Sequence, residues 1–462
     1  MPDISAVFAA DGTLASAIPG YRVRPQQVEM AEQIAATIRG NRVLVVEAGT
    51  GTGKTFAYLA PALLSGGKVI ISTGTKTLQD QLFQRDLPAV REALKVSASI
   101  ALLKGRANYV CHYHLERAVA DGRFQSREEA GHIRTIARFA KTSKSGDKGQ
   151  LAAVPEDSGA WAAATSTREN CLGQECPHHK ECFVLAARRE ALLADIVVVN
   201  HHLFFADVLL RDEGIAELLP ACNTVIFDEA HQLPEVAGMF FGESIGTGQV
   251  IDLARNTRLE AVAAAKDYMP LQDATRDLEK AARDLRLAVT AENARLPAAP
   301  LLNDQNFTQA LTVLDETLAG FAKHLESQAA RSEGLASCLV QTQEIVLRLK
   351  HWRGQEDQTQ VRWVEVFSHA LALNLTPLDV ADIFRRQLEG SLRAWIFTSA
   401  TLAVGNDFSH YRSELGLLEA DTACWGSPFD YGTNALLFAP PGMPDPNSVE
   451  YADAVVEAAY PA

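Results

Sequence analysis

The segment that most constrains this fold is a glycine-rich stretch between an apolar run and a helical pattern. The apolar run covers residues 43–46 (VLVV), and the helical pattern covers residues 55–64. Between them the sequence is Glu47-Ala48-Gly49-Thr50-Gly51-Thr52-Gly53-Lys54-Thr55. Glycines let successive backbone N–H groups turn toward phosphate oxygens, and the dipole of the following helix favours the same anions. The order strand, loop, helix therefore predicts a phosphate-binding loop in an α/β fold.

Two side chains of this loop are suited to a nucleoside triphosphate. The Lys54 ammonium can reach the β and γ phosphates, and the Thr55 hydroxyl can ligate Mg²⁺. The rest of the predicted cradle is backbone, contributed by Ala48, Gly49, Thr50, Gly51, Thr52 and Gly53. ATP and Mg²⁺ are therefore the expected cofactors.

Four further apolar runs resemble the strand before the loop. They cover residues 69–72, 196–199, 225–227 and 395–398, and each is rich in β-branched or aromatic residues. Such runs are typical of strands buried on both faces of a parallel sheet. Helical patterns lie between some of them, such as residues 26–39. Strands alternating with helices predict a doubly wound α/β domain.

An acid pair follows the strand at residues 224–227, in the sequence Asp228-Glu229-Ala230-His231. Ligands of parallel sheets bind at the carboxyl ends of the strands, which is where this pair should lie. Asp228 is expected to hold Mg²⁺, directly or through water, and Glu229 to orient and deprotonate the attacking water. We expect His231 to link the nucleotide site to the rest of the protein.

Three weaker signals accompany these two motifs. The strand at residues 395–398 ends in Ser399-Ala400-Thr401, whose hydroxyls could transmit the state of the γ-phosphate. Gln27, upstream of the phosphate loop, could contact the adenine edge with its amide. Residues 72–79 (STGTKTLQ) carry hydroxyls and amides that suit the phosphates of a nucleic-acid backbone.

Composition narrows the class of protein. The chain has 462 residues, enough for roughly two to four domains. Its net charge of −14 speaks mildly against a protein that simply coats nucleic acid. The sequence has no apolar window of about 18 residues, so no membrane span is expected. Residues 1–20 lack the pattern of a secretory signal, so the expected compartment is the cytoplasm.

Two long stretches interrupt the alternation of strands and helices. The first, residues 104–185, contains a polar piece at 141–150 (KTSKSGDKGQ) that predicts a mobile loop. The second, residues 245–389, is predicted to be almost wholly helical. Two apolar stripes at helical spacing indicate packed helices there: Phe307, Leu311, Leu314, Leu318, Phe321 and Leu325, and Leu271, Ala274, Leu278, Ala281 and Leu285.

Four of the seven cysteines lie in the first of these stretches. They are Cys111, Cys171, Cys176 and Cys182. An odd number of cysteines without an export signal argues against a disulfide framework. Four thiolates can hold a [4Fe–4S] cluster or a tetrahedral Zn²⁺, and spacing does not choose between them. Nearby histidines slightly favour zinc on composition: His112, His114, His178 and His179. Cys222, Cys338 and Cys424 are interpreted as small apolar residues.

Taken in order, the motifs resemble a superfamily 2 helicase of the DinG/YoaA family, bacterial relatives of the DNA-repair helicase XPD. The segments that carry the resemblance are EAGTGTGKT, ISTGTKTLQDQL, VVVNHHLF, FDEAHQLP and FTSATL. The cysteine segment CLGQECPHHKECF, followed by ADIVVVNHHLF, is most like the YoaA-type members. The resemblance covers essentially the whole chain.

This resemblance implies a domain plan and a cofactor. A RecA-like motor domain would comprise residues 1–103, 186–244 and 390–424, and residues 425–462 would begin a second one. Residues 104–185 would form a domain whose four cysteines hold a [4Fe–4S] cluster, and residues 245–389 would form the helical Arch domain. The cluster's expected role is structural, at the point where duplex strands separate.

The implied function is ATP-driven 5′ to 3′ movement on single-stranded DNA and unwinding of forked DNA in repair. A monomer in the bacterial cytoplasm, associated with the nucleoid and with a replication or repair protein, is expected. The family's later arginine motif is missing before Ala462, so weak nucleotide binding and slow hydrolysis are expected of this chain. Alternatives are an RNA- or R-loop-directed ATPase, a DNA-binding fragment without turnover, and a zinc-bound ATP switch.

Overall fold

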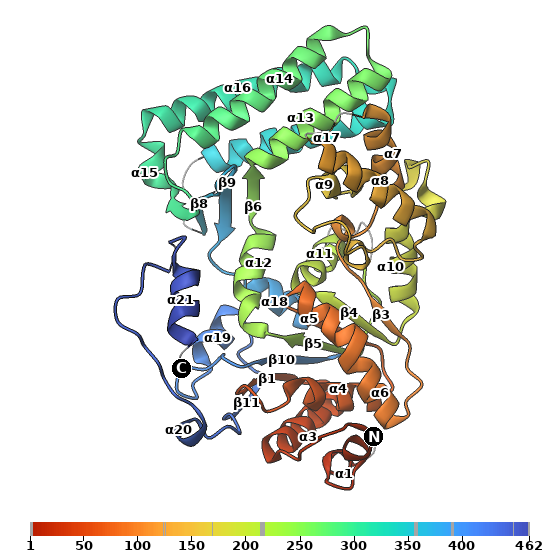
Figure 1. The fold of residues 1–462 in the computed structure, drawn as a ribbon, viewed down its shortest axis with the longest axis vertical. Coiled ribbons are helices and arrows are strands. Elements are labelled where there is room, and N and C mark those ends of the chain that lie inside the picture. Colours follow the sequence, from red (N-terminus) through yellow and green to blue (C-terminus); the bar gives the residue numbers. More distant parts are fainter. Residues whose placement is uncertain are drawn as a thin grey trace.

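A seven-stranded parallel sheet forms the centre of the α/β part of the chain (Figure 1). The computed structural model describes residues 3–122, 124, 126–168, 170–212, 218–354, 359–389, 392–446 and 448–460. The strand order is β11-β1-β10-β5-β2-β4-β3, and every pairing is parallel. The strands are β1 (Val43–Ala48), β2 (Val69–Thr73), β3 (Ile100–Leu102), β4 (Ile196–Asn200), β5 (Thr224–Asp228), β10 (Ala394–Ser399) and β11 (Asp421–Trp425).

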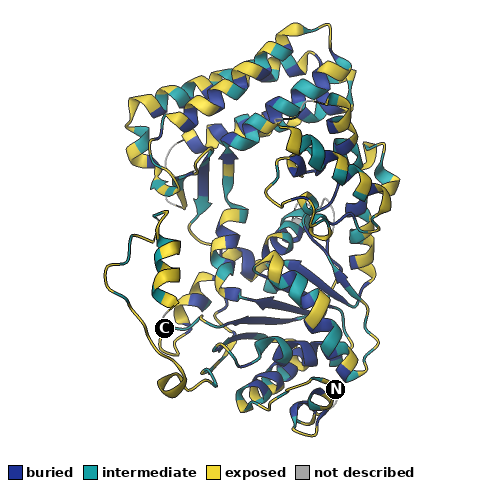
Figure 2. Cartoon of the chain, in the orientation of Figure 1, coloured by how far each residue is buried: buried dark blue, intermediate teal, exposed yellow. Residues whose placement is uncertain are grey.

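Both faces of this sheet are covered by helices, because successive side chains of each strand point to opposite faces. Leu44 and Val46 pack into one apolar cluster, and Val45 between them packs into the other. The first cluster is covered by α1 (Ile4–Phe8), α2 (Thr13–Ala17), α3 (Pro25–Gly40), α4 (Lys54–Leu64) and α6 (Leu87–Leu94). The second is covered by α10 (Phe183–Leu193), α11 (His201–Asp212), α12 (Leu233–Phe241), α18 (Ala381–Leu388) and α19 (Ser409–Glu414). Figure 2 shows these buried strands between helices that are exposed only on their outer faces.

The predicted doubly wound sheet is confirmed, and the five predicted strands match β1, β2, β4, β5 and β10. The strands β3 and β11 were not predicted. β3 has only three residues, and β11 has the half-exposed sequence DTACW at the edge of the sheet. Neither offers the continuous apolar run by which a doubly buried strand is identified.

Above the sheet in Figure 1 lies a helical layer with its own core. It consists of α13 (Thr247–Ala264), α14 (Met269–Leu287), α15 (Ala298–Leu302), α16 (Gln305–Glu326) and α17 (Glu333–Arg353). All six residues of the stripe beginning at Phe307 are buried on α16, as predicted. The stripe on α14 is buried except at Ala274, which is only partly covered.

The prediction that residues 245–389 are almost wholly helical is wrong. A four-stranded antiparallel sheet of order β6-β9-β8-β7 lies under the helices. Its strands are β6 (Glu243–Gly246), β7 (Ala294–Pro297), β8 (Gln360–Val366) and β9 (Leu371–Pro377). In β9 the leucines Leu371, Leu373 and Leu375 are buried at every second position, and in β8 only Val364 and Val366 are buried. The two strong helical stripes earlier in the same stretch outweighed this short signal.

The segment that carries the cysteines packs as a small unit between the sheet and the helical layer (Figure 1). It contains α7 (His112–Asp121), α8 (Arg127–Thr142) and α9 (Ala160–Ala164), and short 3₁₀ turns at Arg106–Asn108, Lys148–Gln150, Gly173–Glu175 and His179–Glu181. Residues 141–150 do not form the predicted loop throughout. They begin as the last turn of α8, end in a 3₁₀ turn, and include the buried Asp147.

After β2 the chain forms α5 (Lys76–Gln81), and after β11 it forms α20 (Tyr431–Asn434) and α21 (Tyr451–Ala459). Gly390, where the motor domain is expected to resume, and Ala462 lie outside the described residues. Within the described ranges, no helix combines the length and apolarity that crossing a membrane requires.

Candidate nucleotide site and cysteine cavity

The phosphate loop lies at the carboxyl end of β1 and leads into α4. Gly51 and Gly53 have φ angles of 86° and 81°, a backbone region that side chains with a Cβ rarely adopt. Helix α4 then begins at Lys54, whose Nζ donates to the Ala48 carbonyl at 3.2 Å. The Thr52 hydroxyl donates to the Gly49 carbonyl at 2.7 Å and closes the turn. The segment therefore has the strand–loop–helix form that the sequence predicts.

Gln27 lies directly against this loop. Its side chain is buried, and its amide donates to the Gly53 carbonyl at 2.9 Å. A Cβ added at Gly53 would lie only 2.1 Å from Nε2 of Gln27, so the contact depends on glycine. The predicted contact of Gln27 with adenine stays a prediction, and the structure shows in addition that this amide supports the loop.

The acid pair lies at the carboxyl end of β5, with only β10 between β5 and β1. Asp228 is 6% exposed and accepts the backbone N–H of Glu229 at 3.1 Å. Burial and the negative charge of Glu229 raise the pKa of Asp228 to about 6, while a hydrogen bond from Tyr58 and the charge of Lys54 act to lower it. The influence of Lys54 on this pKa places the loop lysine and the acid pair in one electrostatic site.

The end of β10 lies between the two motifs and joins them. The buried hydroxyl of Ser399 lies 2.8 Å from Nδ1 of His231 and 3.5 Å from Oε2 of Glu229. Glu47, in the strand before the phosphate loop, accepts the backbone N–H of Ala403 at 2.7 Å. Glu47 was not singled out in the sequence, because its partners lie more than 350 residues away.

Residues 425–431 run along the phosphate loop. The Gly49 N–H donates to the Trp425 carbonyl at 2.9 Å, and the Ser427 hydroxyl donates to the Thr50 carbonyl at 2.8 Å. The Phe429 ring faces Gly51 so closely that a Cβ there would lie 2.2 Å from it. No local pattern indicates this contact, because it joins segments distant in sequence.

A buried histidine lies behind the acid pair. His201 begins α11, and its Nδ1 lies 2.7 Å from the Ser72 hydroxyl at the end of β2. Its other nitrogen, Nε2, is buried and has no hydrogen-bond partner within the described residues. Burial lowers the pKa of His201 to about 3, so this ring is neutral at physiological pH. In the sequence, His201 is only the first of two histidines after a predicted strand, and nothing local indicates its burial or its contact with Ser72.

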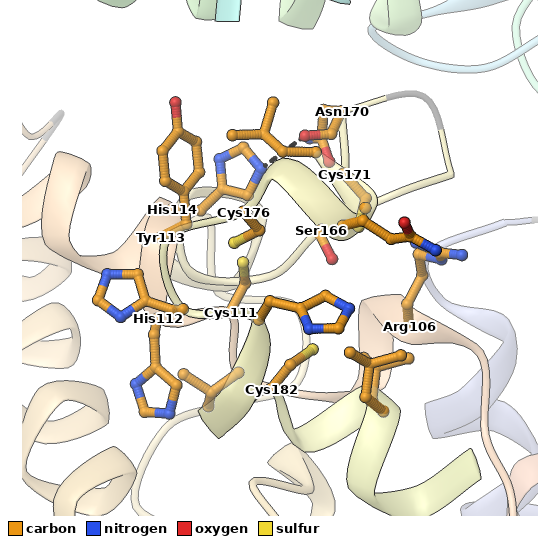
Figure 3. Close-up of a pocket in the computed structure, with 18 of the residues that line it drawn as sticks. Arg106, Cys111, His112, Tyr113, His114, Ser166, Asn170, Cys171, Cys176 and Cys182 are labelled. Carbon is orange, nitrogen blue, oxygen red and sulfur yellow. Dashed lines mark hydrogen bonds between the residues drawn. The ribbon is translucent and has the colours of Figure 1, made fainter. Parts of the chain in front are cut away.

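The four candidate metal-ligating cysteines line one cavity of about 260 Å³ (Figure 3). Cys111 precedes α7, Cys182 precedes α10, and Cys171 and Cys176 flank a 3₁₀ turn. Figure 3 shows the sulfurs of Cys111 and Cys176 directed toward the same central space. Burial raises the pKa of Cys111 to about 11. The structure thus brings together residues that are 71 positions apart at the extremes.

Two of the four histidines near this cavity have other hydrogen-bond partners. His114 Nε2 lies 3.2 Å from the Asn170 carbonyl, and His178 Nε2 lies 2.9 Å from a carboxylate oxygen of Glu116. In the part of the chain that the structure describes, no three His, Cys, Asp or Glu side chains lie close enough together to hold a single metal ion. A tetrahedral zinc with bonds of about 2.3 Å requires ligands that converge closely on one point.

Comparison with known proteins finds helicases. A family described as DEAD/DEAH box helicase matches residues 24–109, which include Gln27 and the phosphate loop. "ATP-dependent DNA helicase YoaA" of Escherichia coli strain K12 is 42% identical over 95% of this chain and 69% of its own length. The protein of the same name from Haemophilus influenzae is 40% identical over 99% of this chain and 72% of its own.

More distant proteins also align over most of the chain. "ATP-dependent helicase DinG" of Mycobacterium tuberculosis strain H37Rv is 29% identical over 96% of this chain and 69% of its own length. A solved structure described as "Truncated XPD" aligns with 85% of this chain and 98% of its own, at 14% identity and a TM-score of 0.42.

Proposed function

Because this chain belongs to the YoaA and DinG family of ATP-dependent DNA helicases, we propose that it hydrolyses ATP to separate DNA strands. The observation that carries the proposal is the meeting of two motifs at one sheet edge. The phosphate loop after β1 and the acid pair after β5 lie on either side of β10, and Lys54 acts electrostatically on Asp228. This is the arrangement that phosphoryl transfer to water requires.

Each side chain has a distinct part in hydrolysis. Lys54 and the loop N–H groups hold the β and γ phosphates, and the positive end of α4 favours the same charge. Thr55 and Asp228 would hold Mg²⁺, which supplies charge neutralisation when bound. Glu229, more exposed than Asp228, orients the attacking water and accepts its proton.

The contacts at Ser399 support a route from the nucleotide to DNA. The Ser399 hydroxyl touches both His231 and Glu229, and β10 continues into the residues held by Glu47. Residues 72–79 run from the end of β2 into α5, and the predicted phosphate contacts of Ser72, Thr73 and Gln79 are wrong, because these side chains are buried. The exposed Thr75, Lys76 and Thr77 remain suited to backbone phosphates. Loss or gain of a γ-phosphate would thereby alter the grip on a DNA strand.

For the four cysteines we propose a [4Fe–4S] cluster in preference to zinc. The donor set is four thiols around one cavity, which fits iron–sulfur chemistry. The resemblance to the DinG/YoaA family, which implies such a cluster at these four cysteines, favours iron–sulfur over zinc. Cys111, Cys171, Cys176 and Cys182 would hold the cluster and brace the small unit built around α7 to α9.

The domain plan and the direction of movement are also part of the proposal. Residues 1–103, 186–244 and 390–424 would be a RecA-like motor domain, 104–185 the cluster domain and 245–389 the Arch domain, with a second motor domain beginning at 425. We propose 5′ to 3′ movement on single-stranded DNA, action at forked DNA during repair in the bacterial cytoplasm, and a monomeric state.

The test is hydrolysis of ATP with and without single-stranded DNA, together with displacement of a labelled strand from a fork. The variant Lys54→Ala removes the phosphate contact, and Lys141→Ala, at an exposed position, is the matched control. We expect DNA to stimulate hydrolysis by wild type and Lys141→Ala but not by Lys54→Ala. Equal rates of ATP hydrolysis in wild type and Lys54→Ala would refute ATP turnover at this site. The alternative of a DNA-binding fragment without turnover would then remain.

A further inference from the structure

Tyr58 connects the helix that carries Thr55 to Asp228, and Thr55 and Asp228 are the two residues that we assign to Mg²⁺. It is located on α4, one helical turn after Thr55, and its side chain is completely buried. The phenol donates a hydrogen bond of 3.0 Å to Oδ2 of Asp228. Thr55 lies on the same helix, near its first residue Lys54. The hydroxyl group therefore ties the helix that carries Thr55 to the strand that carries Asp228.

The environment of Asp228 makes this hydroxyl important. The carboxylate is buried, and a buried charge is costly unless donors compensate for the lost water. Oδ1 accepts the Glu229 N–H, so the phenol is the donor to the other oxygen. A tyrosine phenol has an ordinary pKa of about 10, so it keeps its proton near pH 7 and can donate.

Packing alone does not require the hydroxyl. Tyr58 belongs to the apolar cluster beneath the sheet, where a phenylalanine ring would fill nearly the same space. The hydroxyl adds a fixed link between α4 and β5. Helix α4 follows β1, and β10 lies between β1 and β5 in the sheet. Such a link holds Thr55 and Asp228 at one separation without any ion between them.

We propose that Tyr58 is a positioning residue that presets Thr55 and Asp228 for Mg²⁺ bound with nucleotide. The inference rests on the proposed ATP site and names a further residue in it. Preset ligands bind an ion more tightly, because less order has to be imposed when the ion arrives. Without the phenol, Asp228 loses a donor and its carboxylate can rotate away from Thr55.

The experiment is a Mg²⁺ titration of the binding of a fluorescent, non-hydrolysable ATP analogue, which needs no turnover. Tyr58→Phe is compared with Tyr411→Phe. Tyr411 is the matched control, since it is also buried and its phenol donates to the Ala230 carbonyl at 2.8 Å without touching Thr55 or Asp228. Thermal unfolding of both variants reports the stability lost with each hydroxyl.

In Tyr58→Phe, we expect the Mg²⁺ concentration at the midpoint of the titration to rise about fivefold to tenfold, which corresponds to one hydrogen bond of typical net strength. Binding without Mg²⁺ should be unchanged, and high Mg²⁺ should restore wild-type affinity. Tyr411→Phe should titrate like wild type. Should Tyr58→Phe unfold at the assay temperature, Tyr58→Met fills similar space without a donor and replaces it.

A Mg²⁺ titration of Tyr58→Phe that overlays the wild-type curve would overturn the inference, as would a defect that high Mg²⁺ does not restore. Failure of the proposed function looks different. In that case wild type and Lys54→Ala would bind the analogue equally poorly at every Mg²⁺ concentration, whatever residue occupies position 58.

Discussion

The ammonium group of Lys104 lies 2.9 Å from the carboxylate of Asp147, and both side chains are buried. Asp80, on α5, lies 2.8 Å from the same ammonium. Burial alone would lower the pKa of Lys104, but the hydrogen bonds that its ammonium donates to these two carboxylates outweigh burial, and the pKa is raised. This ion cluster fastens the cysteine-bearing unit to the helix that follows β2.

Removing the Lys104 charge should destabilise the protein strongly. Lys104→Met leaves the Asp80 and Asp147 carboxylates facing each other without a cation, a loss of about 3–5 kcal/mol for a buried pair. Chemical unfolding at pH 7 measures it, with Lys144→Met at an exposed position as control. Lys104→Met combined with Asp147→Leu should recover part of the loss. A free energy of unfolding equal to that of the control would show that the cluster contributes nothing.

Loss of one cavity thiol should remove the proposed cluster. Cys171→Ser is expected to abolish the visible absorbance of the iron–sulfur chromophore and to reduce bound iron well below four per chain. Cys338→Ser is the control, because Cys338 is buried in the helical layer, away from the cavity. Metal analysis completes the test. One zinc per chain and no iron in protein purified without oxygen would contradict the iron–sulfur assignment.

Replacing Ser399 should separate hydrolysis from its stimulation by DNA. Ser399→Ala removes the hydroxyl between His231 and Glu229, each contact being one hydrogen bond of about 1 kcal/mol. We expect about fivefold weaker stimulation by single-stranded DNA with little change in the rate without DNA. Ser244→Ala, at an exposed position of β6, is the control. Equal stimulation in both variants would mean that this hydroxyl carries no signal.

The buried neutral His201 should make stability depend on pH. Its pKa is about 3 in the folded state against an ordinary 6.5, so the unfolded chain binds more protons between these values. The titration of His201 costs little free energy of unfolding above pH 6.5, and this cost grows as the pH falls toward 3. At pH 5 the loss from this group is about 2 kcal/mol.

Urea unfolding at pH 7 and pH 5 measures this loss, with His201→Gln as the variant that cannot titrate. The difference between the two pH values should be about 2 kcal/mol smaller in His201→Gln than in wild type. His410→Gln changes an exposed histidine and should behave as wild type. An identical pH dependence in His201→Gln would exclude His201 as the source.

The parts of the fold that were predictable are those whose signal is local. The phosphate loop is a continuous motif, and its strand and helix follow directly in the sequence. The stripe on α16 was predictable because a helix of 22 residues repeats its apolar spacing several times. By contrast, β8 and β9 have only seven residues each, and their alternation is partial, beside longer helical patterns.

The candidate site divides in the same way. Lys54 and Asp228 were predictable because each belongs to a motif with a known spacing. Tyr58, Glu47 and Phe429 were not, since each is defined by a partner far away in the chain. Asp147 lies in a polar, lysine-rich stretch whose composition predicts a loop, and only its pairing with Lys104 explains its burial.

The position of β1 in the sheet also has a consequence for synthesis of the chain. Its two neighbours are β10 and β11, which follow in sequence only after both long interruptions. The strands β5, β2, β4 and β3 are adjacent to one another and can pair much earlier. A nascent chain therefore carries the phosphate loop on a strand with two open edges until Ala394–Ser399 leaves the ribosome, on the order of tens of seconds later. The nucleotide pocket therefore forms only after both long interruptions have been synthesised, and until then the apolar strand β1 has unpaired edges that favour aggregation.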